Sequence, residues 1–156
     1  MSIHAIGDSV LQGAGHTLYD TLRLAIPGIT EDAEPSRKFA AAVDLVGAVL
    51  AGPTPPATVV IALGTNGPVS AATFDAVVAL GHTSRFAFVN VKVPHGWETA
   101  VNETLAAGVG AHPDRCLLVD WYAVASSYPE CLNADGYHVT RHGAIVYAAT
   151  LAVTLG

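Results

Sequence analysis

Continuous apolar runs alternate with segments of helix length along the whole chain, and this alternation constrains the fold more than any other feature. The clearest run is TVVIAL, residues 58–63, in which every residue after Thr58 is apolar. Strands that are apolar throughout and alternate with helices are typical of a parallel sheet that is covered on both faces. The other predicted strands span residues 2–6, 29–34, 85–91 and 117–120.

Helical periodicity is clearest near the N-terminus. Leu11, Leu18 and Leu22 recur at near-helical spacing, which predicts a helix over residues 10–25. Pro27-Gly28 then ends it. The other predicted helices span residues 37–51, 70–80, 99–110 and 141–155, the last with Thr140 as its N-cap. We therefore predict one α/β domain over residues 1–156, with a five-stranded parallel sheet in a three-layer α/β/α arrangement.

Composition excludes several classes of protein. Hydrophobic residues make up 51% of the chain and charged residues 13%, which disfavours disorder. The net charge is −6 with only two lysines, Lys38 and Lys92, so we expect no nucleic-acid partner. No apolar run is long enough to span a bilayer, and no signal-peptide pattern is present. We expect no membrane insertion: the chain as written is cytoplasmic, or extracytoplasmic if it is a domain excised from a larger membrane protein.

The metal-ligand residue types do not form a recognisable site. Cys116 and Cys131 are too few and too far apart for a cysteine zinc site. They are interpreted as two buried thiols or as one disulfide. No histidine pair has the H-E-x-x-H spacing. We therefore expect neither a metal nor any other cofactor.

Polar residues that could perform chemistry follow three of the predicted strands. Gly7-Asp8-Ser9 comes after the first strand, and Gly64-Thr65-Asn66 comes after the third. Asp135-Gly136-Tyr137-His138 follows the fifth strand across a longer loop. Ligands of open parallel sheets bind outside the carboxyl ends of the strands. We therefore expect these three segments to meet at one edge of the sheet.

A serine, a histidine and an aspartate in these positions suit acyl transfer. Ser9 would be the nucleophile, His138 the base that takes its proton, and Asp135 the carboxylate that orients the imidazole. The alternatives are that Ser9 only caps a helix and that Asp135-Gly136 is only a turn. The α/β-hydrolase pattern G-x-S-x-G does not fit, because Leu11 stands where it needs glycine.

Asn66 and Asp8 need separate interpretations. The amide of Asn66 can donate to the oxyanion of a tetrahedral intermediate, together with the backbone N–H of Ser9. The alternative is that Asn66 is only a turn residue within GTNGP. Asp8 is interpreted as a carboxylate at a helix start or in a loop, and not as a catalytic one.

The three segments together resemble the SGNH (GDSL-type) hydrolase family. G-D-S, G-x-N and D-x-x-H occur in the family's order between residues 7 and 138. The resemblance implies a flavodoxin-like sheet and a second oxyanion N–H, which the family takes from a glycine after the second strand. Ser36 in DAEPSRKF aligns there, since Pro35 has no N–H. Serine can replace glycine at that position if its backbone is ordinary.

A finer resemblance lies between these blocks. VVIALGTNGPVS, VNVKVPHGWETAVNETL, LLVDWYAVAS and DGYHVTRHGA look like the SGNH domains of peptidoglycan O-acetyltransferases and acyltransferase-3 proteins. That subfamily tends to have Arg-Pro before Trp-Glu, where this chain has His95-Gly96. Three residues are candidates for contacting substrate: Arg37 against an anion, His95 in the pocket lining and Trp97 against a sugar face. The simpler interpretations are a surface ion pair, a loop residue and a core or rim filler.

Three functions are compatible with these residues. The leading one is a serine esterase that removes small acyl groups, O-acetyl foremost, from a carbohydrate through an acyl-Ser9 intermediate. The second is an O-acetyltransferase that acts on a glycan such as peptidoglycan. The third is a non-catalytic carbohydrate-binding module with the same fold, which the complete set of Ser9, Asn66, Asp135 and His138 disfavours.

Overall fold

All 156 residues are described by a computed structural model, whose centre is a five-stranded sheet. Every pair of neighbouring strands is parallel, in the order β2-β1-β3-β4-β5. This order confirms the predicted flavodoxin-like sheet. It places β1 and β3 side by side at the centre, with the crossover that separates them passing through β2. The strands are β1 Ile3–Gly7, β2 Thr30–Ala33, β3 Thr58–Ala62, β4 Arg85–Val89 and β5 Cys116–Val119.

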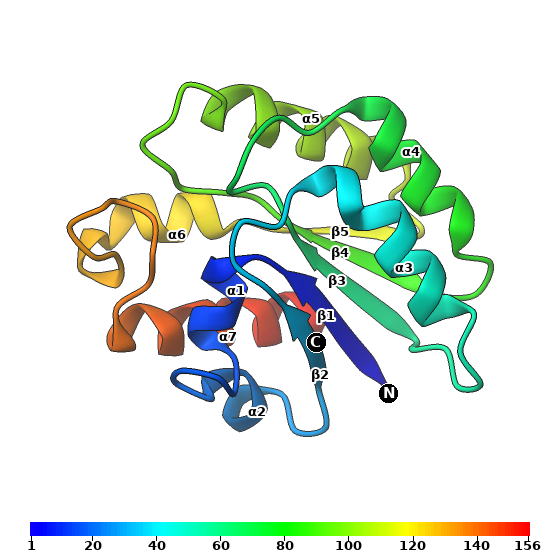
Figure 1. The fold of residues 1–156 in the computed structure, drawn as a ribbon, viewed down its shortest axis with the longest axis horizontal. Coiled ribbons are helices and arrows are strands. Elements are labelled where there is room, and N and C mark those ends of the chain that lie inside the picture. Colours follow the sequence, from blue (N-terminus) through cyan, green and yellow to red (C-terminus); the bar gives the residue numbers. More distant parts are fainter.

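Helices cover both faces of this sheet, as predicted for three layers (Figure 1). One face carries α3 Ala42–Leu50, α4 Ala71–Leu80 and α5 Glu98–Ala111. The other face carries α1 Ser9–Ala14, α2 Thr21–Ala25, α6 Trp121–Ser127 and α7 Arg141–Leu155. Two short 3₁₀ helices complete the structure, η1 Phe39–Ala41 and η2 Pro129–Cys131. No helix is both long and apolar enough to cross a membrane.

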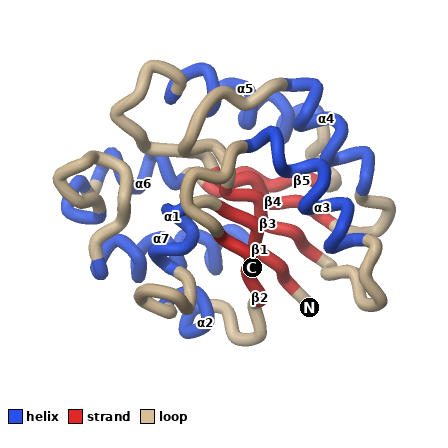
Figure 2. The backbone as a smooth tube through the Cα atoms, in the orientation of Figure 1, coloured by secondary structure: helices blue, strands red, loops and turns tan.

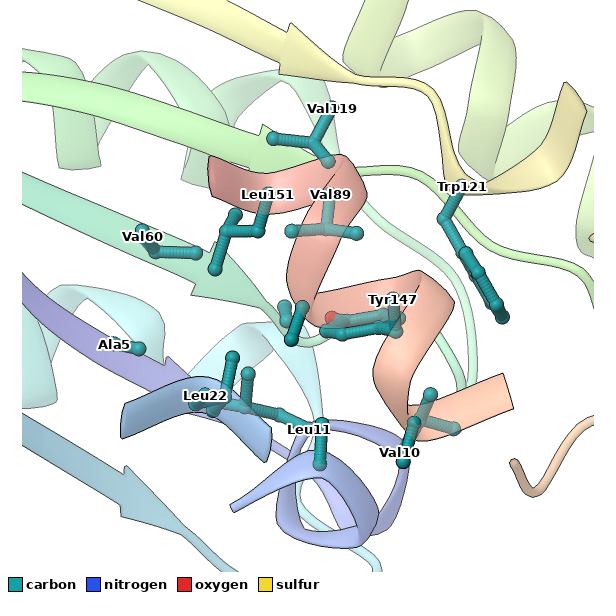
Figure 3. Packing of buried hydrophobic residues seen from close by; sticks show 14 of the residues in the cluster. Ala5, Val10, Leu11, Leu22, Val60, Val89, Val119, Trp121, Tyr147 and Leu151 are labelled. Carbon is teal, nitrogen blue, oxygen red and sulfur yellow. The ribbon is translucent and has the colours of Figure 1, made fainter. Parts of the chain in front are cut away.

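Two hydrophobic cores hold the layers together, one on each face of the sheet. All five residues of β3 are buried, as expected for a central parallel strand. On the α3–α5 face, the rings of Phe74 and Phe88 stack at 4.2 Å between centroids. On the other face, Tyr147 of α7 packs among Val10 and Trp121 (Figure 3). The second core therefore extends directly behind the turn that carries Ser9.

The helix predicted over residues 10–25 is wrong as one element, because the chain forms α1 and α2 with a break between them. Gly15 ends α1 in an extended conformation. At the break, the N–H of His16 donates to the carboxylate of Glu31 in β2 at 2.7 Å, and a Cβ on Gly15 would lie only 2.4 Å from the same carboxylate, which would have to move. Asp20 then takes a left-handed conformation with φ 55°. The helix therefore ends where the chain packs against β2, although the leucines continue at helical spacing.

The remaining differences from prediction concern short elements. Residues 37–51 divide into η1 and α3, and α6 was not predicted. Helix α6 has only seven residues and begins where the Asp120 carboxylate accepts a hydrogen bond from the N–H of Ala123. A helix of two turns offers too few residues for a periodic pattern.

Candidate active site

The first strand ends in a tight turn that presents Ser9. Strand β1 stops at Gly7, and Ser9 is already the first residue of α1. A Cβ on Gly7 would lie 2.4 Å from the side chain of Leu11, so a larger residue does not fit the turn. The N–H of Asp8 donates to the carbonyl of Ala62 in the neighbouring strand β3, at 3.1 Å. The loops that follow the strands gather at this edge of the sheet (Figure 2).

Ser9, His138 and Asp135 form a connected chain of contacts at this edge. The Oγ of Ser9 lies 2.9 Å from Nε2 of His138. The other ring nitrogen, Nδ1, lies 2.6 Å from Oδ2 of Asp135. These distances meet the geometric requirement for a nucleophile, a general base and an orienting carboxylate. Residues 129 positions apart in sequence are thus brought into direct contact.

A closed loop explains how an aspartate three residues before a histidine can reach its ring. The N–H of Asn133 donates to the carbonyl of His138 at 2.8 Å, which closes the loop. Gly136 turns the chain with φ 84°. The second oxygen of Asp135, Oδ1, accepts hydrogen bonds from the N–H groups of Tyr137 and His138, both at 3.0 Å.

These contacts also set the charge of Asp135. Its slight burial raises the pKa of the carboxyl, but the hydrogen bonds from Tyr137 and His138 outweigh that effect and hold the pKa below its ordinary value. Asp135 therefore stays ionised throughout the neutral range, as required of a group that stabilises an imidazolium.

The oxyanion side of the site is built from three loops. Ser9 is the first residue of α1, so its N–H has no carbonyl partner within the helix. The Nδ2 of Asn66 donates to the carbonyl of Arg37 at 3.0 Å. An amide nitrogen carries two hydrogens, so one remains to donate to a bound oxyanion. The loop after β2 and the loop after β3 are therefore linked at the predicted oxyanion position.

The backbone of Ser36 differs from the expectation. The condition for serine at this position, an ordinary backbone, is not met, because Ser36 has φ 65°, in the left-handed region that favours glycine, so its role as an oxyanion donor stays a prediction. The adjacent Arg37 carbonyl contacts Asn66, so the turn does lie beside the oxyanion loop.

Arg37 is engaged with the protein, as in the simpler interpretation of an ion pair, and its contact with an anionic substrate stays a prediction. Its guanidinium donates to the carbonyl of Asp32 at 2.8 Å and to the carboxylate of Asp32 at 3.0 Å. It also lies 3.4 Å from the carboxylate of Glu34 and 3.4 Å from the carbonyl of Gly7. The side chain is only 10% exposed. We therefore assign Arg37 a structural role, in which it ties the loop after β2 to the end of β1.

Asp8 does more than the helix-start role expected of it. Its Oδ1 accepts from the N–H of Val10, which caps α1, at 3.0 Å. Its Oδ2 accepts from the N–H of Thr65, the residue before Asn66, at 3.3 Å. The residue is 1% exposed, and this burial raises the pKa of its carboxyl. Sequence reasoning found the cap but missed the contact with the second loop.

An aromatic row runs from the triad across the loop that follows β4. The ring of Tyr137 lies 4.0 Å from that of His138, and the ring of His95 lies 5.8 Å from Tyr137. Trp97 is next, 4.6 Å from His95. The structure thus places the two predicted substrate-binding residues of this loop near the triad. Tyr137 was missed, although it stands inside the Asp-Gly-Tyr-His block.

The remaining titratable groups do not assemble into a second centre. Cys116 and Cys131 are both free and buried, which confirms the two-thiol interpretation. No group of three or more His, Cys, Asp or Glu side chains is arranged to hold a metal ion. None of the cavities is lined by Ser9, Asn66 or His138. The side chains of His138 and Asp135 are 36% and 40% exposed, so this part of the triad is accessible at the surface.

No protein-family model matches the chain. The chain is 31% identical over 147 residues to the peptidoglycan O-acetyltransferase OatA of Listeria monocytogenes, an alignment that covers 94% of this chain and 23% of OatA. The chain thus spans about a fifth of the length of the curated relatives it matches. It is also similar to the solved C-terminal catalytic domain of OatA from Streptococcus pneumoniae, with a methylsulfonyl adduct. There the identity is 26% and the TM-score 0.86, over 99% of this chain and 92% of that domain.

More distant structures share the fold alone. A family 3 carbohydrate esterase from Clostridium thermocellum has a TM-score of 0.76 at 14% identity, over 99% of this chain and 94% of its own. In its parallel sheet and in these comparisons the chain is similar to acyl-transferring enzymes of the serine esterase class. The chain is similar to peptidoglycan O-acetyltransferases over about a fifth of their length, and its fold is that of SGNH (GDSL-type) hydrolases.

Proposed function

We propose that the chain removes small acyl groups, O-acetyl foremost, from a carbohydrate through an acyl-Ser9 intermediate. The observation that carries the proposal is the continuous contact from Ser9 to His138 at 2.9 Å and from His138 to Asp135 at 2.6 Å. A serine hydroxyl is a weak nucleophile until a base removes its proton. His138 is the only ring within hydrogen-bond distance of that hydroxyl.

In the first half-reaction, His138 takes the proton of Ser9 as Oγ bonds to the carbonyl carbon of the ester. The carbonyl oxygen becomes an oxyanion, which the N–H of Ser9 and the free N–H of Asn66 stabilise. Asp135 stabilises the imidazolium that forms. The intermediate then breaks its bond to the alcohol oxygen, which receives the proton from Nε2 of His138. The products are the free alcohol and acyl-Ser9.

In the second half-reaction, His138 removes a proton from water, whose oxygen attacks the acyl carbon. Collapse of the second tetrahedral intermediate breaks the bond to Ser9 Oγ, which regains its proton from His138. The released product is a carboxylic acid. A sugar hydroxyl in place of that water gives an acylated sugar, so esterase and transferase share the same machinery up to this step.

Two observations support a short acyl group on a sugar. No cavity of the structure is lined by Ser9, so a long acyl chain has no enclosed pocket beside the nucleophile. One cavity is lined by Asp8 and Val10, the residues on either side of Ser9. Its volume is about 10 Å³, enough for about one water molecule. The relatives that are 31% identical are named as acetyltransferases of a glycan, peptidoglycan.

The names of these relatives also make O-acetyl transfer to a glycan the second candidate. We rank hydrolysis first because His95-Gly96 replaces the Arg-Pro of the related loop. The non-catalytic carbohydrate-binding alternative has no support in the geometry, since Ser9, His138 and Asp135 are in contact.

A chito-oligosaccharide that carries O-acetyl esters tests the proposal. Wild-type protein is expected to release acetate from it, and Ser9→Ala to release none. Ser126→Ala is the matched control, because Ser126 is an exposed serine on α6, and it is expected to behave as wild type. Equal release by wild type and Ser9→Ala would contradict the proposal. In a second arm, an activated acetyl ester is supplied with the unacetylated oligosaccharide. Free acetate as the main product supports the esterase, and acetylated sugar supports the transferase.

A further inference from the structure

The proposed function fixes which side of the site the alcohol part of the ester must occupy. Nε2 of His138 gives a proton to the leaving oxygen, so that oxygen must come within about 2.6–3.2 Å of it. The carbonyl oxygen is instead directed to the N–H of Ser9 and to Asn66. The alcohol part of the substrate therefore extends from His138, and whatever lies beside His138 contacts it.

One ring lies beside His138, and a second lies beside that ring. Tyr137 is next to it at 4.0 Å between ring centroids, and His95 lies 5.8 Å further along, at an interplanar angle of 52° to Tyr137. Tyr137 is half-buried and His95 is exposed. They come from different loops, which meet where Gly136 packs near Pro94. A single surface is thus formed by the loop after β4 and the loop before α7.

Trp97 is held behind this surface. Its indole N–H donates to the carbonyl of Thr65 at 3.2 Å, and its ring packs against the hydrophobic core on the α3–α5 face. These contacts fix the ring in place and leave it supporting His95, 4.6 Å away. Trp97, whose contact with a sugar face stays a prediction, therefore also packs against the ring of His95.

We propose that Tyr137 and His95 form the subsite for the sugar ring that bears the acyl group. The inference rests on the proposed function, and it adds the surface that recognises the alcohol part of the ester. Both rings have an apolar face and a polar edge, which matches the apolar faces and equatorial hydroxyls of a pyranose. Subsites of this kind combine apolar contact area with a few polar groups that fix orientation.

The test compares two esters that share an acetyl group and differ in the alcohol. One is an O-acetylated chito-oligosaccharide. The other is vinyl acetate, whose alcohol part is too small to reach His95. Tyr137→Ala is expected to lower kcat/KM about five- to tenfold on the oligosaccharide, the loss of one ring contact, and to leave vinyl acetate unchanged. His95→Ala is expected to act in the same direction. Tyr137→Phe keeps the ring and is expected to retain most of the oligosaccharide activity.

Matched controls are available on the same chain. Tyr128 and His82 are exposed and lie outside the site, so Tyr128→Ala and His82→Ala are expected to match wild type on both esters. Equal losses on both esters by Tyr137→Ala would overturn the subsite, since Tyr137 would then act by holding His138. No loss on either ester would also overturn it. Wild type that cleaves vinyl acetate but not the oligosaccharide would reject the sugar and leave the Ser9 chemistry intact.

A second inference concerns Asp8, and a different set of contacts carries it. The Asp8 carboxylate accepts one hydrogen bond from the turn that carries Ser9 and one from the loop that carries Asn66. It is almost completely buried, so water does not compete for either bond. Asp8 also lines a small cavity together with Asn90, Lys92 and Tyr147, but its carboxylate is hydrogen-bonded only to Val10 and Thr65.

We infer that Asp8 is a positioning residue that aligns the nucleophile with the oxyanion donor. Ser9 lies one residue after Asp8, and Asn66 lies one residue after Thr65. Since the two oxygens of one carboxylate bind both loops, the distance between Ser9 and Asn66 is set through Asp8. Without the Thr65 contact, we expect the fold to remain but the distance between Ser9 and Asn66 to be no longer fixed.

Asp8→Ser separates this role from helix capping. Serine caps a helix about as well as aspartate, but its shorter side chain has only one oxygen and cannot bind both loops. We expect kcat to fall about tenfold with KM within about twofold of wild type, because an interaction made in the transition state is weakened. In an Asn66→Ala background, the same substitution is expected to lower kcat by less than about twofold.

Melting temperatures of all variants provide the control. Equal losses of kcat in both backgrounds would overturn the inference, because Asp8 would then act independently of Asn66. A rise in KM without a fall in kcat would overturn it as well. Asp8→Asn keeps the size of the side chain and serves as a second variant. Failure of both variants to fold would show that Asp8 is required for the fold and not for alignment.

Discussion

The side-chain amide of Asn66 donates to the backbone carbonyl of Arg37 at 3.0 Å, across the space between the loop after β3 and the loop after β2. This bond uses one hydrogen of the amide and orients the other. Asn66 is therefore held in place before any substrate arrives, as expected of a donor that stabilises a transition state without reorganisation.

Replacement of Asn66 should be a test of transition-state stabilisation. Removal of one oxyanion donor costs about 2.7–4 kcal/mol, so Asn66→Ala is expected to lower kcat by about 100- to 1000-fold with little change in KM. Steady-state kinetics on p-nitrophenyl acetate measures both constants. Asn133→Ala, in the loop before α7, is not a suitable control because Asn133 closes the His138 loop. Asn102 is likewise bonded to Val91, so the control is a cooperative melting transition of Asn66→Ala above the assay temperature, which shows that the variant is folded. An increase in KM alone would assign Asn66 to substrate binding.

The left-handed backbone of Ser36 predicts a stabilising substitution. A residue other than glycine at φ 65° is strained, and glycine relieves that strain at some cost in unfolded-state entropy. Ser36→Gly is expected to raise the free energy of unfolding by about 0.5–1 kcal/mol, or the Tm by about 1–4 °C for a chain of this length. Ser70→Gly, at a helix N-cap with an ordinary φ of −89°, is expected to lower the Tm. A lower Tm for Ser36→Gly would contradict the account.

The contacts of Arg37 predict a loss of stability without a loss of substrate affinity. Arg37→Met removes hydrogen bonds from a buried guanidinium to the carbonyl and carboxylate of Asp32. We expect the free energy of unfolding to fall by about 1.5–3 kcal/mol in denaturant titrations. KM for acetyl esters should stay within about twofold of wild type. The neighbouring exposed Lys38 supplies the control, since Lys38→Met should change neither quantity. An unchanged stability with a raised KM would restore the substrate role.

Asp135→Asn should impair catalysis through the imidazole tautomer. The new amide would present a donor to Nδ1 of His138, which puts the ring proton on Nε2, where Ser9 needs an acceptor. We expect kcat to fall by about 10³- to 10⁴-fold, measured as acetate release near neutral pH. A variant that keeps wild-type kcat would remove Asp135 from the mechanism.

The same substitution predicts a pH dependence of stability. The folded protein holds the pKa of Asp135 below its ordinary value of 3.8, so the charged carboxylate stabilises the fold above that pH. The contribution is lost as the pH falls from 3.8 through the lowered pKa. The Tm difference between wild type and Asp135→Asn is therefore expected to be constant near neutral pH and to shrink in acid. A difference that grows in acid would contradict the lowered pKa.

The arrangement of the sheet and the triad could be predicted because both follow from local patterns. The apolar run at 58–63 and its equivalents indicate parallel strands, and the rule that sites lie at their carboxyl ends brings Ser9, Asn66 and His138 together. Asp135 lies in the same short segment as His138, and the Asp135-Gly136 pair predicts the turn that brings them together. Each of these inferences needs only the order of elements along the chain.

What could not be predicted depends on contacts between distant segments. At the break after Gly15, the N–H of His16 donates to the carboxylate of Glu31 in the neighbouring strand, and Arg37 is bonded to Asp32 and to the end of β1. Tyr137 gains its place from loops that meet only in the folded chain. The positive φ of Ser36 has no signal in the residue type, since serine does not favour that conformation.

Mass spectrometry of the protein after reaction with phenylmethylsulfonyl fluoride tests the central claim most directly. The account predicts one sulfonyl adduct, mapped by peptide sequencing to Ser9, together with complete loss of p-nitrophenyl acetate cleavage. His138→Ala should label far more slowly, because the hydroxyl of Ser9 then lacks its base. Ser9→Ala should not label at all and should keep the wild-type Tm. An adduct on another residue, or near-wild-type turnover by Ser9→Ala, would contradict the account.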